Sequence, residues 1–282
     1  MTTWHVPRES HQRLCEGMLK YSLGVDCLSA SARERQDTGK FGERRIMIFD
    51  SESVFEENVI TVLKQHGWKD GVLRYPTEQD LLDNWKGILY RNNNDIDRLG
   101  KYPLTDGEMT QIIEQIETLR TPLALNSFVN GRTVSITRDN KEDVAHFGKE
   151  VSLYIYDRKE IAGGKSTYQI AQQPVYPAKN KMLNSRRGDL VLLINGMPLI
   201  HIELKKSGIP VSQATNQIEK YAHEGVFTGL FRLVQIFVAM TPDDAVYFAN
   251  PGADKFNPSY YFHWADYNNE PICGCLLYTS DA

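Results

Sequence analysis

Residues 186–206, which read RRGDLVLLINGMPLIHIELKK, give the strongest indication of the fold. Two runs rich in apolar residues, 189–194 and 199–205, flank the short segment Asn195-Gly196-Met197-Pro198. An Asn-Gly pair between two such runs is typical of a tight turn between strands. We therefore expect two neighbouring buried strands joined by this segment.

The second of these strands carries charged residues in an alternating pattern. Alternation predicts His201, Glu203 and Lys205 on one face, with apolar residues on the other. Carboxylates and an ammonium at the ends of buried strands cost free energy unless they meet a cation, each other or a substrate. Asp189 and Glu203 could share Mg²⁺, which usually takes one or two carboxylates, and Lys205 could orient or deprotonate an attacking water. The pattern predicts phosphodiester hydrolysis.

The simpler alternatives need no metal and no substrate. Asp189 could merely begin a strand, and Glu203 with Lys205 could be a surface ion pair. The register of the hairpin separates the two interpretations, because a two-residue turn at Asn195-Gly196 sets Asp189 opposite Ile202, on the wrong face. A shared site therefore predicts a longer loop or a bulge near 195–198.

The rest of the chain alternates between helical and strand patterns. Capping boxes are expected at Ser53–Glu56 and at Thr105–Glu108, and Thr77 is expected to begin a further helix. The expected helices run from Ser53 to Gly67, from Thr77 to the run at 92–94, from Thr105 to just before Pro122, and over 211–223; the expected strands lie near 134–136, 151–155, 189–194, 199–205, 231–240 and 245–249. This order predicts an α/β fold, a mixed sheet flanked by helices with an N-terminal helical part.

Composition limits the class of protein. The chain has 282 residues and a formal net charge of -4, so no global positive field draws it to nucleic acid. It contains neither an apolar run of about 18 residues nor a signal peptide. Four cysteines, at 15, 27, 273 and 275, lack zinc-ligand spacing. We expect a cytoplasmic protein with reduced thiols, an irregular or disordered extension at 1–46, a folded domain at 47–270 and an unrelated tail at 271–282.

Asp189, followed by thirteen residues and then Glu203-Leu204-Lys205, resembles the PD-(D/E)xK nuclease core. The segment from Gly188 to Lys205 is similar in sequence to the N-terminal endonuclease domain of type I restriction enzyme R subunits. Gly188 stands where the name of the superfamily has proline. No P-loop pattern G-x-x-x-x-G-K-[ST] occurs, so the ATP-driven motor of a whole R subunit is missing and the chain is expected to be a fragment.

Three further motifs resemble the same family in the same order. Phe55-Glu56, in a helix that ends at Gly67-Trp68, looks like the opening helix of the family and its acidic residue. Gln172-Gln173 is similar to a polar strand segment of the family that precedes the core. Gln217-Ile-Glu-Lys-Tyr221 resembles the Q-x-x-x-Y motif that follows the core. The resemblance covers roughly residues 47–270.

The resemblance implies a restriction-endonuclease-like fold, Mg²⁺-dependent cleavage of double-stranded DNA, and partners that supply target specificity and modification, with ATP used only by the missing motor. It also implies residue roles: Asp189, Glu203 and Glu56 as metal ligands, Lys205 as the residue that serves the attacking water, and Gln217 and Tyr221 as backbone-positioning residues. Separately, a local excess of cations in the sequence predicts Arg186, Arg187 and Lys206 as DNA-binding residues.

Several of these roles have alternatives. Glu56 could be the reciprocal acid of a capping box on Ser53. Gln217 and Tyr221 lie one helical turn apart and could simply pack against each other. His201 is interpreted as a packing residue or as a residue behind the metal ligands. The excess of cations among Lys179, Lys181, Arg186, Arg187, Lys205 and Lys206 could be a DNA groove or a solvated face. The whole chain could also be a stand-alone repair or mobile-element nuclease, or a docking module that does not cut.

Overall fold

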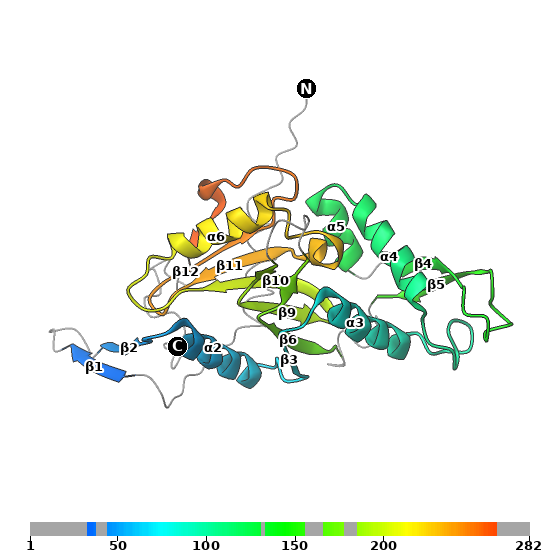
Figure 1. Cartoon of the computed structure of the whole chain (residues 1–282), viewed down its shortest axis with the longest axis horizontal. Coiled ribbons are helices and arrows are strands. Elements are labelled where there is room, and N and C mark those ends of the chain that lie inside the picture. The colour runs from blue at the N-terminus through cyan, green and yellow to red at the C-terminus, as the bar shows by residue number, and fades with distance from the viewer. Residues whose placement is uncertain (1–32, 38–43, 131–132, 156–165, 178–184, 264–282) are drawn as a thin grey trace, which may run out of the picture.

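A seven-stranded mixed sheet forms the centre of the protein (Figure 1). The computed structural model describes residues 33–37, 44–130, 133–155, 166–177 and 185–263. The sheet has the order β13-β12-β11-β10-β9-β6-β3. Its strands are β3 (Val72–Arg74), β6 (Tyr168–Gln172), β9 (Leu190–Ile194), β10 (Met197–Leu204), β11 (Ile236–Met240), β12 (Ala245–Ala249) and β13 (Phe262–His263). The pairs β10–β11 and β3–β6 are parallel, and the other neighbours are antiparallel. The predicted mixed α/β architecture is confirmed.

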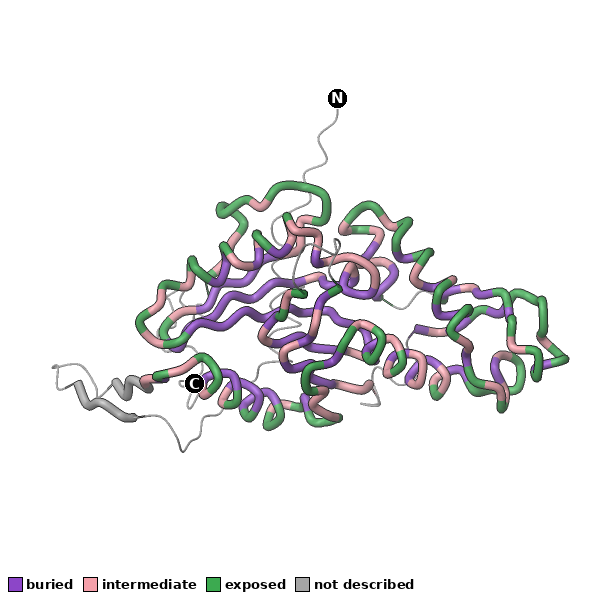
Figure 2. The backbone as a smooth tube through the Cα atoms, in the orientation of Figure 1, coloured by how far each residue is buried: buried purple, intermediate pink, exposed green. Residues whose placement is uncertain are grey.

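The two faces of the sheet pack against different elements. On β11, Ile236 and Val238 belong to the larger apolar core, which also contains Phe55 of α2 (Glu52–Gln65). Phe237 and Ala239, on the other face of β11, belong to a smaller core that includes residues of α6 (Ser212–His223). All eight residues of β10 are buried, since this strand is covered on both faces (Figure 2).

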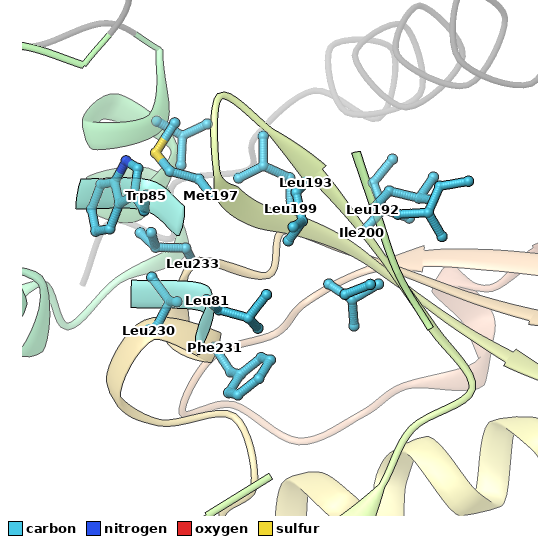
Figure 3. Packing of buried hydrophobic residues seen from close by; sticks show 14 of the residues in the cluster. Leu81, Trp85, Leu192, Leu193, Met197, Leu199, Ile200, Leu230, Phe231 and Leu233 are labelled. Carbon is cyan, nitrogen blue, oxygen red and sulfur yellow. The ribbon is translucent and has the colours of Figure 1, made fainter. Parts of the chain in front are cut away.

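Helix α3 (Glu78–Asn92) packs directly on the β9–β10 hairpin. Figure 3 shows Leu81 and Trp85 of α3 beside hairpin residues and beside the 3-10 helix η1 (Gly229–Leu233). A Cβ at Gly196 would lie 2.9 Å from the Cα of Trp85, and the φ of Gly196 is 83°. Glycine at the turn therefore allows both the left-handed backbone and the close approach of the helix.

Two of the expected helix starts are confirmed and one is wrong. Thr77 and Thr105 cap α3 and α4 (Asp106–Thr118) with complete capping boxes. Helix α2 instead begins after Ser51, whose side chain accepts a hydrogen bond from the backbone N–H of Val54. Ser53 therefore lies inside the helix, and Glu56 is not the acid of a capping box.

Other elements differ from the expectation or extend it. Pro122 begins a further helix, α5 (Pro122–Val129), because proline fits the first turn of a helix. The expected strand at 231–240 is shorter, since η1 occupies its start and β11 begins at Ile236. Outside the main sheet, β4 (Thr133–Thr137) pairs with β5 (Glu150–Tyr154), and β7 (Val175–Tyr176) pairs with β8 (Arg186–Arg187).

The part of 1–46 that the structure describes is not irregular. Strand β1 (Arg33–Asp37) pairs antiparallel with β2 (Arg44–Ile48), so the expectation of an unstructured extension is wrong there. Residues 1–32 and 38–43, the tail at 271–282, Lys179, Lys181 and the four cysteines lie outside the described residues. Among the described helices, none is long and apolar enough to cross a membrane.

Candidate active site

A β-bulge in the central hairpin brings the two predicted metal ligands together. The turn itself has two residues, Asn195 and Gly196, and pairs Met197 with Ile194. The register then shifts between Pro198 and Ile200, so that the pairs beyond the shift are Ile200 with Leu192, His201 with Val191 and Ile202 with Leu190. One step further in the same register sets Asp189 opposite Glu203. The predicted bulge is confirmed, and Leu199 is its extra residue.

The two carboxyl groups lie in an apolar setting. Asp189 Oδ2 accepts a hydrogen bond of 2.7 Å from the backbone N–H of Leu204, and Glu203 is fully buried. Burial raises the pKa of both side chains to about 7; the charge of Glu203 adds to the rise at Asp189, and Lys205 opposes the rise at Glu203. Such a pair holds protons near neutral pH unless a cation takes their place.

Lys205 is itself buried and lies against this pair. Its Nζ is 3.4 Å from Glu203 Oε1 and 3.7 Å from Glu52 Oε1, and it donates a 2.9 Å hydrogen bond to the carbonyl of Leu204. The structure therefore brings Asp189, Glu203 and Lys205 to one place: the alternation along β10 accounts for Glu203 and Lys205, and the bulge accounts for Asp189.

Glu56 is buried on α2 and is held by the polar pair at the end of β6. Its Oε1 accepts a 2.5 Å hydrogen bond from Gln172 Nε2, and its Oε2 accepts a 3.2 Å hydrogen bond from Gln173 Nε2. Burial raises the pKa of Glu56, and the charge of Asp189 adds to the rise. Glu56 is thus within electrostatic reach of Asp189, and Gln172 and Gln173 hold its carboxylate, a role that the sequence alone left undefined.

The residues present fit a hard divalent ion that keeps part of its water shell. Glu203 Oε2 is buried and has no hydrogen-bond partner, so one ligand oxygen is available. In the described part of the chain, no three His, Cys, Asp or Glu side chains converge on one point. The fit rests on the two carboxyl groups of Asp189 and Glu203, because Mg²⁺ is usually bound through one or two carboxylates plus waters and substrate oxygens.

Gln217 and Tyr221 connect α6 to the strand that precedes Asp189. Gln217 Nε2 donates to the hydroxyl of Tyr221, which donates to the carbonyl of Arg187; both hydrogen bonds are 2.7 Å. Burial, with a contribution from the charge of Glu203, raises the pKa of Tyr221 to about 12. The two side chains also line an open depression of about 370 Å³, together with Arg186, Gln213, Asn216 and Lys220.

The predicted DNA-binding cations differ in their surroundings. Arg186 donates two hydrogen bonds, of 2.7 and 2.8 Å, to the carboxylate of Glu224. Arg187 is exposed, and its guanidinium carbon lies 5.9 Å from the centre of the Tyr75 ring. Lys206 is exposed directly after Lys205. Arg186 is therefore already neutralised by an acid, whereas the other two face solvent.

His201 lies behind Glu203, as expected from the alternation. It is fully buried, its Nδ1 is 2.8 Å from the hydroxyl of Tyr176, and its Nε2 is 3.4 Å from Glu203 Oε2. Burial lowers the pKa of His201 to about 4, so the ring is neutral. Sequence reasoning missed Tyr176, because it lies on the separate short strand β7 and no motif points to it.

Comparisons with known proteins identify the family of the chain. The family described as Type I restriction enzyme R protein N terminus (HSDR_N) matches residues 50–256. A type I restriction enzyme endonuclease subunit of Staphylococcus saprophyticus is 31% identical over 232 residues, which cover 80% of this chain and 22% of that protein. The type I restriction enzyme EcoprrI endonuclease subunit of Escherichia coli is 28% identical over 232 residues, 79% of this chain and 67% of that protein.

The chain thus spans about a fifth of the length of the staphylococcal relative. A type I restriction enzyme endonuclease subunit of Staphylococcus aureus is 31% identical over 228 residues, which cover 80% of this chain and 22% of that protein. The family match contains every predicted site residue from Glu56 to Tyr221. The chain belongs to the family of type I restriction enzyme R protein N termini.

Proposed function

We propose that this chain is the Mg²⁺-dependent endonuclease domain of a type I restriction enzyme R subunit and that it hydrolyses phosphodiester bonds of double-stranded DNA. The observation that carries the proposal is the bulge at Leu199, because it sets Asp189 opposite Glu203 with Lys205 3.4 Å from Glu203. A hairpin that served only the core would gain nothing from an extra residue that gathers three ionisable groups in an apolar place.

Each residue has a role that its position supports. Asp189 and the free Oε2 of Glu203 would hold the ion, and Glu56 would act from the side of α2 as a further acid. Bound Mg²⁺ would polarise the phosphodiester and stabilise the charge that develops on its oxygens. Lys205 would orient the attacking water and offset negative charge on the phosphate.

The DNA backbone would pass along α6 and the exposed cations. Gln217 is anchored through Tyr221 to the carbonyl of Arg187, so it would position the backbone near the two carboxylates. Arg187 and Lys206 would bind flanking phosphates. Specificity and modification subunits would choose the target, ATP would be used by a motor elsewhere in the full-length subunit, and the complex would act in the cytoplasm, where the DNA is.

The test is cleavage of a supercoiled plasmid by the 282-residue chain with Mg²⁺. We expect Lys205→Ala to lower the rate about 100-fold or more, the usual effect of losing one group that stabilises the transition state. Lys141→Ala, which removes an exposed lysine on another loop, should leave the rate unchanged. Cleavage that survives Lys205→Ala would refute the assignment. Salt-sensitive DNA binding without cleavage would instead favour a docking module.

A further inference from the structure

Two buried polar atoms without hydrogen-bond partners face each other in this site. Among the described residues, four buried side-chain atoms lack a partner, and two of them are Nε2 of His201 and Oε2 of Glu203. These two atoms are 3.4 Å apart. This distance is just beyond that of an ordinary N–H···O hydrogen bond, so a small movement of either side chain would satisfy both atoms.

Aromatic side chains surround His201 and fix the plane of its ring. The ring centroids of Phe227, Phe237, Tyr176 and Tyr221 lie 5.4, 6.0, 6.1 and 6.3 Å from that of His201. This apolar setting disfavours a charged imidazole. His201 therefore cannot serve as a counter-ion for Glu203 and can act on it only as a neutral hydrogen-bond donor.

Tyr176 determines which nitrogen of His201 carries the proton. Its hydroxyl lies 2.8 Å from Nδ1. A phenolic O–H that donates to Nδ1 leaves the imidazole proton on Nε2, which is the nitrogen that faces the carboxylate. The opposite tautomer would place a nitrogen lone pair against Glu203 Oε2, and two acceptors that face each other repel.

We propose that Tyr176 and His201 form a buried relay of hydrogen bonds that positions Glu203 for the divalent ion, with Tyr176 donating to Nδ1 and Nε2–H donating to Oε2. This inference rests on the proposed function. Each carboxylate oxygen accepts at more than one site, so Oε2 can take this hydrogen bond and still bind a cation. Partners that orient metal ligands in this way typically contribute 10- to 100-fold in metal affinity.

The relay also explains the glycine at position 188. A Cβ there would lie 2.6 Å from the hydroxyl oxygen of Tyr176 and 2.8 Å from Cε1 of His201. Any larger residue would push the two rings apart, and Gly188 directly precedes Asp189. The position that is proline in the name of the superfamily is therefore glycine here because the space is occupied by the relay.

The test measures metal binding without DNA and without catalysis. Mn²⁺ replaces Mg²⁺, since the electron paramagnetic resonance signal of the free ion reports how much of it the 282-residue chain has bound. We expect His201→Phe to weaken Mn²⁺ binding 10- to 100-fold, and Tyr176→Phe, which keeps the ring, to weaken it severalfold. His201→Gln, which keeps a donor of similar reach, should remain within about threefold of the wild type.

Phe248→Leu serves as the matched control. It alters the same aromatic layer one ring further out, since Phe248 packs on Phe237, whereas the ring contacts of His201 among the described residues are with Tyr176, Tyr221, Phe227 and Phe237. Its Mn²⁺ affinity should equal that of the wild type. Wild-type affinity in His201→Phe, or equal losses in the Gln and Phe variants, would overturn the relay. Failure of the wild-type chain to bind Mn²⁺ would instead overturn the proposed function on which the relay rests.

Discussion

At the scale of single residues, the site depends on the cost of burying like charges. Asp189 and Glu203 face each other across the hairpin, and Glu56 adds a third acid within electrostatic reach. Lys205 offsets part of this charge from the edge of the site. A cluster that is acidic and desolvated in this way has an excess of negative charge that a cation would neutralise.

The raised pKa values predict how the stability of the metal-free chain depends on pH. Asp189 and Glu203 have pKa values of about 7 in the folded chain, against ordinary values near 4 in the unfolded chain. Between these limits the folded form binds more protons. The free energy of unfolding should therefore fall as the pH rises from about 4 to about 7, and this contribution should be constant above that range.

The measurement is urea unfolding in EDTA at several pH values, with Asp189→Asn as the comparison. As the pH rises through this window, the unfolding free energy of the wild type should fall relative to that of the variant. Affinity for Mn²⁺ should change in the opposite direction, rising with pH up to about 7, because the ion binds the ionised carboxylates. A difference that is independent of pH would contradict the raised pKa values.

At the scale of helices and strands, the elements that the sequence predicted are those with a strong local signal. Thr77 and Thr105 begin helices as expected, because each has a side-chain acceptor and an acid three residues later. Ser53 has the same local pattern, yet Ser51 caps the helix. The two serines lie two residues apart, and the local pattern alone does not distinguish between them.

The elements that the sequence did not predict are short or lack a local period. Strand β3 has three residues and β7 has two, too few for alternation to be recognised. The bulge could be predicted because chemistry required Asp189 and Glu203 on one side. The hydrogen bonds of Gln172 and Tyr176 could not, since they join segments far apart in the chain and depend on tertiary packing.

Arg138 ties helix α4 to strand β4 and gives a prediction at this scale. It is fully buried and donates hydrogen bonds to Glu108 at 2.6 Å, to Asp143 at 3.1 Å and to the carbonyl of Tyr102 at 3.1 Å. Glu108→Ala should cost about 3–5 kcal/mol of unfolding free energy, because it leaves a buried guanidinium short of one partner. Thr105→Ala, which removes the cap of the same helix, should cost only about 1 kcal/mol.

Urea unfolding of both variants tests this ranking. A loss in Glu108→Ala no larger than that in Thr105→Ala would mean that Asp143 and the carbonyl of Tyr102 satisfy the guanidinium and that the ion pair with Glu108 adds nothing. Neither residue is near the carboxylates of the site, so Mn²⁺ affinity measured well below the unfolding transition should be unchanged in both variants.

Taken over the entire chain, the net charge opposes binding of DNA, the proposed substrate. The chain carries a formal charge of -4, so attraction to DNA has to come from a local face. Arg187 and Lys206 are exposed cations that lie close in sequence to Asp189 and Glu203. Arg186, next to them in sequence, is held by Glu224. The local field therefore depends on particular side chains rather than on the total charge.

The ion pair of Arg186 with Glu224 and the exposure of Arg187 predict how strongly each arginine contributes to the salt dependence of DNA binding, because an arginine that neutralises a phosphate releases a counterion from the DNA. The logarithm of the binding constant should fall with the logarithm of the salt concentration, with a slope of about -0.9 for each phosphate that the protein neutralises. Arg187→Gln should make this slope shallower by about 0.9, and Arg186→Gln by less, because Arg186 first has to leave Glu224. Fluorescence anisotropy of a short labelled duplex in EDTA, from low to moderate salt, measures both slopes. Equal changes would mean that the Arg186–Glu224 pair opens on DNA, and an unchanged slope in Arg187→Gln would place the DNA on a different face of the protein.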